Sequence, residues 1–284
     1  MPYRLDKTFK SITANPYQRP NYAEFSPCEA LSPYVRCFWI SENHNKTEYN
    51  SLVIPDICMD IIVTDHFADF CGINNRAFFS ENNDMRFFGV RFFAWSVALF
   101  TDTGMNNALN FNGNAAEYFP DFPTTEVLQS NLEGKIKIVE KYLLNRLNTK
   151  RENADVMNSL YHVIRTDGRT DVADLSDYCA VSKRQLERKF AEQIGVSPKQ
   201  MINLLRYQLL WQDCIKPDFN TLDSVEKFGY FDQSHMLNEF KKYHGISLGK
   251  ARENVAFLQY TTPLNRYNKK EERGDRLINA LSPK

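Results

Sequence analysis

The sequence predicts an α+β protein with a β-rich N-terminal domain and an all-α C-terminal domain built from a repeated pair of helices. Three observations predict this fold class. Short apolar runs separated by turn residues occur before residue 120, helical apolar spacing follows, and the helical part repeats itself with an offset of fifty residues. The 284 residues, 43% of them hydrophobic, suffice for about two domains with packed cores.

The first 122 residues are expected to form the β-rich domain. Their apolar runs are short and bounded by Asn, Asp, Pro and Gly, which is typical of strands separated by turns. The runs are Val35–Ile40, Leu52–Ile54, Met59–Thr64, Ala77–Phe79 and Phe87–Phe93. The stretch Ala94–Thr101 is expected to be a short helix.

A helical connector is expected over residues 123–150. From Thr124 onward, apolar residues recur every three or four positions, which is the spacing of an amphipathic helix. They are Val127, Leu128, Leu132, Ile136, Val139, Leu143 and Leu147. The polar segment Asn148–Asn153 then marks a boundary, and helical periodicity continues to about residue 258. Residues 259–284 are expected to form a charged tail.

The repeat has a cap, a helix and a stop in each copy. Ser182, Leu186, Phe190, Gly195 and Ser197 correspond to Asp232, Met236, Phe240, Gly245 and Ser247. Ser and Asp are N-cap residues because their side-chain oxygens accept hydrogen bonds from free backbone N–H groups, and Gly takes the left-handed conformation that ends a helix. The apolar pair four residues apart in each copy predicts one buried helix face and one exposed face.

A shorter helical pattern precedes each capped helix. Cys179–Val181 separates the first pair and Gly229–Phe231 the second, so each copy consists of a helix, a three-residue turn and a helix. One such helix-turn-helix unit occurs in many all-α proteins and is weak evidence for DNA binding. Two units joined by an apolar helix over Pro198–Ile215 are stronger evidence. They lie in an expected domain of residues 151–258.

Local charge points in the same direction, although the net charge of the chain is zero. Residues 181–190 hold four basic side chains against one acidic side chain, whereas residues 171–180 hold three Asp and no basic residue. A basic face can approach phosphate. A basic segment is also common on an ordinary solvated helix.

Several motifs carry a family resemblance: Leu175–Phe190, Gly195–Pro198, Gly229–His235, Phe240-Lys241 and Gly245–Ser247. On these motifs, residues 155–255 resemble the DNA-binding domain of the AraC/XylS family of bacterial transcription activators. The resemblance implies that the two capped helices lie in successive major grooves on one side of the duplex, about one helical turn apart.

The resemblance also implies which side chains contact DNA. They are Ser182, Lys183, Arg184, Glu187, Arg188 and Lys189 in the first unit, and Gln233, Ser234, Leu237 and Asn238 in the second. The second unit departs from the family pattern at three places. The family usually has Ile-Ala where this chain has Ser224-Val225, a basic residue where it has Asn238, and Pro where it has Leu248. We therefore expect the first, basic unit to supply most of the affinity, with Arg184 and Arg188 on one helix face reading guanine. Lys189 is a candidate for a phosphate contact.

The N-terminal half carries a looser resemblance on Leu31–Trp39, Pro55-Asp56 and Gly89–Phe92. These residues resemble the sensor or dimerisation domain of some of the same regulators, which implies a small β-barrel or sandwich that binds an effector, pairs two subunits, or both. This half also contains a cluster of aromatic residues, which is either part of the core or the lining of an effector pocket. Its members are Phe87, Phe88, Phe92, Phe93, Trp95 and Phe100. Arg91 is either an inward anion contact or an outward surface charge.

Motifs for catalysis or metal binding are absent from the sequence. The five His show no HExxH spacing, and neither GxSxG nor GxGxxG occurs, so no enzymatic activity and no cofactor are expected. The six cysteines form no CxxC pair and are expected to be reduced, mostly buried thiols. A metal site of His66, Cys58 and Cys71 is an alternative that no spacing supports. Without a signal peptide or a long apolar run, a cytoplasmic location is expected.

These observations predict a DNA-binding transcription regulator, acting as an activator under the control of its N-terminal domain. The expected partners are double-stranded DNA, RNA polymerase, a small-molecule effector and a second copy of the chain, and no membrane. One alternative is a small-molecule-binding or enzymatic protein whose helical half is structural only, with no salt-dependent DNA affinity. Another is a regulator that acts through protein contacts alone and tolerates charge substitutions at Arg184 and Arg188.

Overall fold

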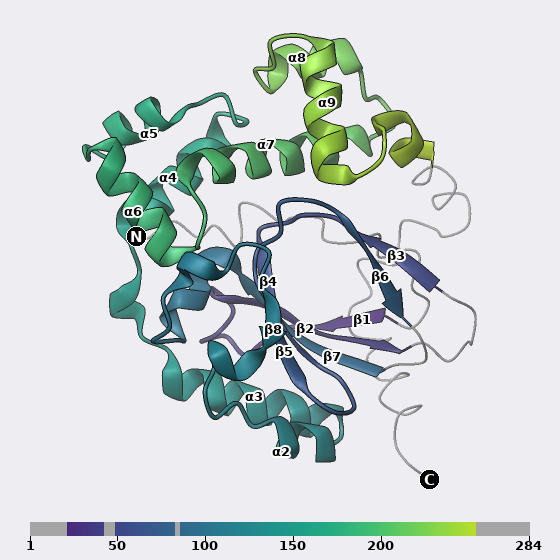
Figure 1. Cartoon of the computed structure of the whole chain (residues 1–284), viewed down its shortest axis with the longest axis vertical. Coiled ribbons are helices and arrows are strands. Elements are labelled where there is room, and N and C mark those ends of the chain that lie inside the picture. The colour runs from purple at the N-terminus through teal and green to yellow at the C-terminus, as the bar shows by residue number, and fades with distance from the viewer. Residues whose placement is uncertain (1–21, 43–48, 83–85, 254–284) are drawn as a thin grey trace.

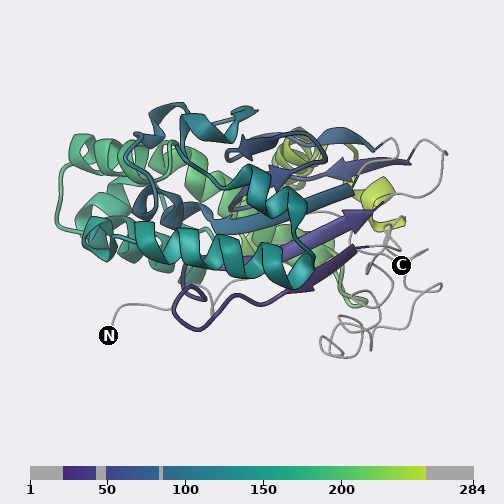
Figure 2. The same cartoon turned by 90° about the horizontal axis from the view of Figure 1, so that it is seen from below.

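The computed structural model describes residues 22–42, 49–82 and 86–253. Within these residues, an antiparallel sheet forms the N-terminal region and a set of helices the C-terminal region, which confirms the α+β class. The sheet lies between the C-terminal helices on one side and the connector helices α2 and α3 on the other (Figure 1). Seen from below, α3 covers one face of the sheet (Figure 2).

Six strands form the main antiparallel sheet, in the order β1-β2-β7-β4-β5-β8, and two others pair as β3-β6. Their bounds are Tyr22–Phe25 (β1), Val35–Glu42 (β2), Tyr49–Val53 (β3), Cys58–Val63 (β4), Ala68–Cys71 (β5), Phe78–Asn82 (β6), Arg86–Phe93 (β7) and Asn112–Asn114 (β8). The five predicted runs coincide with or overlap β2, β3, β4, β6 and β7. Strands β1, β5 and β8 were not predicted.

The two faces of the sheet differ in chemistry because side chains alternate along each strand. On one face, the Phe88 ring lies 5.9 Å from the Lys135 ammonium of α3. On the other face, Arg91 pairs with Asp60 at 3.0 Å, and Trp39 Nε1 donates to the same carboxylate at 2.8 Å. Arg91 therefore makes the inward anion contact rather than an outward surface charge.

The connector consists of two helices, α2 (Thr124–Gln129) and α3 (Leu132–Arg146), instead of the single helix predicted over this region. The break occurs because Ser130 is extended and the Asn131 side chain accepts a hydrogen bond from the backbone of Gly134, which begins a new helix. The predicted short helix after β7 is confirmed as a 3₁₀ helix, η2. The 3₁₀ helices are Ala94–Leu99 (η2), Met105–Asn107 (η3), Ala115–Glu117 (η4) and Thr149–Arg151 (η5).

The C-terminal helices are arranged along α7, which joins two helix pairs (Figure 1). Their bounds are Ala154–Arg165 (α4), Val172–Tyr178 (α5), Lys183–Gln193 (α6), Pro198–Cys214 (α7), Thr221–Lys227 (α8) and Gln233–His244 (α9). The prediction of a long joining helix is confirmed, with Ile215 as its C-cap. Among the described residues, no helix has the length and apolarity that crossing a membrane requires.

The apolar core continues from the sheet into the C-terminal helices without interruption. Trp95, Met105 and Ala108 belong to the same buried cluster as Phe190 and Ile194 of the first helix pair. The expected domain limits at residues 122 and 151 therefore remain a prediction. The expected charged tail, residues 259–284, lies outside the described residues.

Candidate nucleic-acid interface

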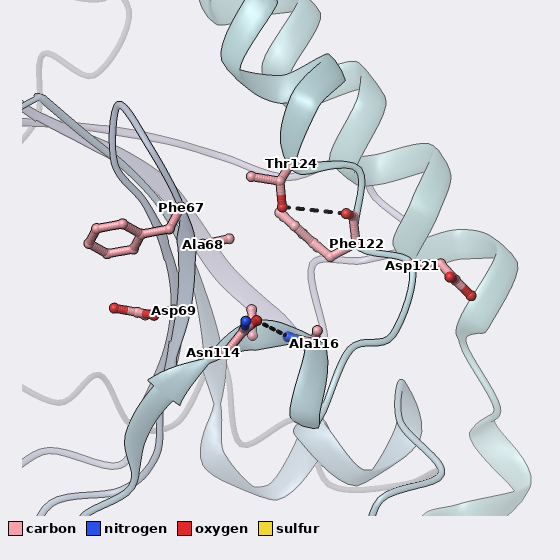
Figure 3. Close-up of a pocket in the computed structure, with 9 residues that line it drawn as sticks. Phe67, Ala68, Asp69, Asn114, Ala116, Asp121, Phe122 and Thr124 are labelled. Atoms are coloured by element: carbon pink, nitrogen blue, oxygen red, sulfur yellow. Dashed lines mark hydrogen bonds between the residues drawn. The ribbon is translucent and has the colours of Figure 1, made fainter.

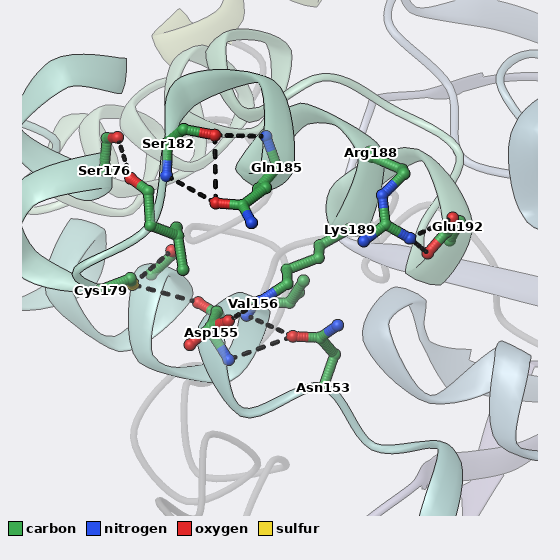
Figure 4. Close-up of polar contacts among 12 residues, drawn as sticks. Asn153, Asp155, Val156, Ser176, Cys179, Ser182, Gln185, Arg188, Lys189 and Glu192 are labelled. Atoms are coloured by element: carbon green, nitrogen blue, oxygen red, sulfur yellow. Dashed lines mark hydrogen bonds and ion pairs between the residues drawn. The ribbon is translucent and has the colours of Figure 1, made fainter.

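Helices α5 and α6 form the first helix-turn-helix unit. The Ser182 hydroxyl accepts from the Gln185 backbone N–H at 3.2 Å, and the Gln185 side chain accepts from the Ser182 backbone N–H at 2.9 Å. This reciprocal pair is a capping box, which satisfies two free donors at the start of α6 (Figure 4). The predicted N-cap is thereby confirmed.

The buried face of α6 determines which side chains remain available. Leu186 and Phe190 are almost completely buried, as their spacing predicts. The candidate DNA-contacting residues of the helix are exposed on other faces: Lys183, Arg184, Glu187 and Arg188. The first unit therefore presents three cationic side chains to solvent.

Arg188 and Lys189 have different surroundings although they are neighbours in sequence. Arg188 Nη1 contacts both carboxylate oxygens of Glu192, at 2.9 and 3.1 Å, in an exposed pair on the same helix. Lys189 is half-buried and pairs with Asp155 of α4 (Figure 4). The charge of Lys189 is thus already neutralised within the protein.

Helices α8 and α9 form the second unit. Asp232 accepts from the His235 backbone N–H at 2.7 Å and caps α9, while Gly245 ends it with a φ of 79°. Both predictions, the cap and the stop, are confirmed. Met236 and Phe240 are buried. Of the candidate contact residues, Gln233, Ser234 and Asn238 are exposed and Leu237 is half-buried.

The two turns are not equal in length, contrary to the predicted three-residue turn in each unit. Residues 179–182 separate α5 from α6, whereas residues 228–232 separate α8 from α9. A residue with positive φ occurs in both turns, Ala180 (53°) and Gly229 (67°). Because the second turn is longer by one residue, the fifty-residue offset holds for the caps but not for the turns.

A buried ionic cluster, which the sequence did not predict, fixes α9 on α7. Arg206 Nη2 lies 3.1 Å from the Glu239 carboxylate, with both side chains about nine-tenths buried. The Tyr230 hydroxyl donates to Glu239 at 3.1 Å, and its ring lies 4.8 Å from the Arg206 guanidinium carbon. A lone Arg on an apolar helix gives no sequence signal of its partner, which is 33 residues away.

A second contact between α7 and α9 involves His244. The Tyr207 hydroxyl lies 2.8 Å from His244 Nδ1, and both residues are buried. Burial lowers the pKa of His244 to about 4 because desolvation disfavours the imidazolium. The second unit is therefore held to α7 by a neutral hydrogen bond and a charged pair.

The N-terminal region contacts both units. Gln193, at the end of α6, donates to the carbonyl of Trp95 at 2.7 Å. The Ala77 backbone N–H donates to the carbonyl of Tyr243 in α9 at 2.9 Å. Between them, Gln208 of α7 donates to the carbonyl of Pro55. These three hydrogen bonds connect the β-rich region to the first unit, the joining helix and the second unit.

Candidate effector sites are less well defined. A cavity of about 280 Å³ opens beside β5 and α2. On one side of this cavity, the side chains of Phe67 and Asp69 point away from Phe122 and Thr124 on the other side (Figure 3). The polar groups of the lining therefore do not converge on a common point where a ligand could bind. The aromatic cluster of β7 and η2 is mostly core: Phe88, Phe92, Phe93, Trp95 and Phe100 are buried.

The described cysteines and histidines are not grouped as a metal site. Cys37, Cys58 and Cys214 are buried and Cys28, Cys71 and Cys179 half-buried, all as free thiols. His66 is exposed whereas Cys58 is buried. Within the described ranges, no three His, Cys, Asp or Glu side chains are grouped so that they could hold a metal ion.

Comparison with known proteins gives two family matches. Residues 23–112 match a domain of unknown function (DUF6597), and residues 175–254 match a helix-turn-helix domain. No curated protein matches the chain. Among solved structures, the chain is similar to ToxT from Vibrio cholerae O395, with 13% identity, a TM-score of 0.38, and coverage of 84% of this chain and 96% of ToxT. Another structure of ToxT from Vibrio cholerae, in a P21 crystal form, gives 13% identity and the same TM-score, with coverage of 88% of this chain and 99% of that chain.

Proposed function

We propose that this chain, which carries an AraC-type helix-turn-helix domain after an N-terminal domain of unknown function, is a sequence-specific transcription regulator. In this proposal it binds double-stranded DNA through α6 and α9. The observation that carries the proposal is the duplication. Two capped helices, each with a buried apolar face and exposed polar residues, are held by one joining helix.

The two helices have different roles in the proposed complex. Lys183 and the Ser182 end of α6 meet phosphate, while Arg184 and Arg188 reach base edges, with Glu187 between them. On α9, Gln233, Ser234 and Asn238 offer neutral hydrogen-bonding groups beside Leu237. Among the candidate contact residues, α6 has three exposed cations and α9 none, which favours α6 as the source of most of the affinity. The exposed Lys241 and Lys242 of α9 lie in its last turn, away from the proposed reading residues at its start. The pair with Asp155 favours a structural role for Lys189 over a phosphate contact.

The N-terminal domain controls DNA binding in this proposal. Its hydrogen bonds reach α6, α7 and α9, so a change in the sheet that moves Trp95 and Ala77 apart would alter how the two reading helices are placed. An effector or a second copy of the chain would act by favouring one placement over another. We further propose that the protein works in the bacterial cytoplasm as an activator that contacts RNA polymerase.

The experiment is a selection of DNA fragments with the purified full-length chain, followed by binding isotherms at several salt concentrations. We expect enrichment of a defined site. The logarithm of the binding constant should fall linearly with the logarithm of the salt concentration, with a slope of about −0.9 for each phosphate neutralised. Arg184→Ala with Arg188→Ala should abolish the preference for that site. Lys137→Ala, which removes an exposed cation from α3, is the matched control and should leave binding unchanged.

The alternatives predict other outcomes. If no fragment is enriched and binding shows no salt dependence, the helical half is structural only and the proposal fails. If the double Arg variant keeps full activity in a reporter assay, the protein acts through protein contacts alone. Activation is tested in the same assay by comparing transcription with and without the protein, and a decrease would make it a repressor.

A further inference from the structure

Phe231 is the most exposed large apolar side chain of those that the structure describes. Its exposed fraction is 90%, against 69% for Leu222 and less than half for the next aromatic residues. Its neighbours Asp232, Gln233 and Ser234 are also exposed, and all three are polar. Phe231 is therefore followed in sequence by exposed polar residues and not by further apolar ones.

Phe231 is also the additional residue of the second turn. In the first unit, the Val181 N–H donates to the carbonyl of Ser176 at 3.0 Å, and the cap Ser182 follows directly. In the second unit, the Tyr230 N–H makes the equivalent bond, to Val225 at 2.9 Å, but Phe231 lies between Tyr230 and the cap. Phe231 thus has no counterpart in the first unit.

The fold does not use the Phe231 side chain for packing. Tyr230 holds the turn, since it is buried, bonded to Glu239 and stacked on Arg206. Phe231 itself makes a backbone contact, in which its N–H donates to His235 Nδ1 at 3.4 Å. The turn is therefore anchored on its inner side, and the phenyl ring is directed to solvent immediately before the cap of α9.

We propose that Phe231 reads a thymine by packing its ring against the C5 methyl group in the major groove, at the edge of the site bound by α9. This inference rests on the proposed function. The N-terminal residues of a recognition helix are the ones that reach base edges, and Phe231 lies two residues before the first helical residue of α9. A phenyl ring cannot hydrogen-bond a base edge, and the thymine methyl is the apolar group that the major groove offers.

The surroundings favour DNA over a protein partner as the occupant. Protein interfaces use contiguous apolar patches with several anchoring side chains. Phe231 is a single ring followed by a cap and two polar residues that the proposed function places on DNA. Base contacts of this kind need only one apolar side chain.

The test replaces each thymine of the selected duplex with deoxyuridine, which lacks only the methyl group. For the full-length wild-type chain, one replacement should weaken binding by about threefold to fivefold, as expected for one methyl group removed from an apolar contact. Phe231→Ala should weaken binding to the thymine duplex by about tenfold. The variant should not distinguish thymine from deoxyuridine at that position.

The control is Leu144→Ala, which removes an exposed apolar side chain from α3 and should leave every affinity unchanged. Thermal melting checks that Phe231→Ala is folded, as its lack of packing predicts. If the wild-type chain selects no DNA, the proposed function itself fails. If it selects DNA but Phe231→Ala discriminates thymine from deoxyuridine as the wild type does, or weakens specific and scrambled duplexes equally, the thymine contact is refuted. Loss of reporter activity with unchanged DNA affinity would place Phe231 on a protein partner and also refute it.

Discussion

Arg188 lies on the exposed side of α6 with its guanidinium against Glu192, one turn further along the helix. An exposed pair at this spacing contributes only about 0.3–0.5 kcal/mol to stability. The pair does, however, restrict the orientation of a side chain that presents two donors to guanine in the proposed complex. Removal of Arg188 should therefore affect recognition far more than folding.

Arg188→Ala should weaken the specific site by about 1–3 kcal/mol and relax the preference at one base pair, as expected for a lost bidentate contact. The measurement is a pair of binding isotherms, on the selected duplex and on a scrambled one. Asn238→Ala is the comparison on α9, and any change of preference it causes should occur in the other half of the site. Equal losses for Arg188→Ala on both duplexes would show that this side chain does not read a base.

Lys189→Ala addresses the pair between α6 and α4. Because Lys189 and Asp155 are each about one-fifth exposed, solvent screens this pair less than an exposed one, and we expect a coupling above the roughly 0.3–0.5 kcal/mol of an exposed helix pair in a double-mutant cycle of Lys189→Ala and Asp155→Ala. Urea unfolding of the four proteins measures it. The salt slope of DNA binding should stay unchanged, and a decrease of about one would instead assign Lys189 to a phosphate.

Single residues were predicted well where local chemistry determines their role. Ser182 and Asp232 are caps, and Gly195 and Gly245 end their helices, because capping depends on neighbours within a few residues. Partners distant in sequence were not predicted. Arg206 with Glu239 is a pair of this kind, since nothing in the local sequence indicates which helix will lie opposite.

At the scale of elements, apolar patterns located the long helices and the central strands. Strand β8 was not predicted because its sequence, Asn-Gly-Asn, has neither apolar alternation nor β-branched residues. Its pairing with β5 depends on the tertiary fold. The connector was predicted as one helix because its apolar spacing continues through Asn131, where a side-chain cap begins α3. The additional turn residue Phe231 was not predicted either, because the caps Ser182 and Asp232 match at an offset of fifty residues and the alignment of the caps does not reveal a longer second turn.

The packing of α9 on α7 predicts a pH dependence of stability. Burial holds the pKa of His244 at about 4, below the unfolded value of about 6.5. The unfolded chain therefore binds a proton first as pH falls, so stability is complete above about pH 6.5 and decreases down to about pH 4, by up to about 3 kcal/mol. His244→Gln should remove this part of the decrease.

The measurement is urea unfolding between pH 4 and pH 7, in the wild type and in His244→Gln. His235→Gln is the matched control, because His235 is about half exposed. It should retain the wild-type pH dependence. A His244→Gln profile parallel to that of the wild type would contradict the assignment to His244.

At the scale of the whole molecule, the β-rich region and the first unit meet closely at Gly195. This residue has a φ of 85°, and an added Cβ would lie 2.1 Å from the carbonyl oxygen of Met105. Gly195→Ala should therefore destabilise the full-length chain by more than the roughly 1–2 kcal/mol of left-handed strain alone. In a fragment of residues 151–258, which we expect to fold and bind DNA, only the strain should remain.

Urea unfolding of the full-length chain and of the fragment, each with and without Gly195→Ala, measures the difference. Gly249→Ala, which has nothing within 4 Å of the added Cβ, is the control in both. Equal losses in the two backgrounds would show that the contact with Met105 contributes nothing. An insoluble fragment would show that the domain boundary near residue 151 is wrong.

The apolar core that passes from the sheet into α6 also affects how the protein responds to heat. Because the two halves share one core, they should melt as one cooperative unit in the full-length chain, and any molecule that binds the sheet should raise the melting temperature of the helices as well. Trp211, buried in α7, could then report by its fluorescence on a ligand bound near Trp39, far from it in sequence. A library of metabolites could therefore be screened by thermal shift alone, before any operator sequence is known.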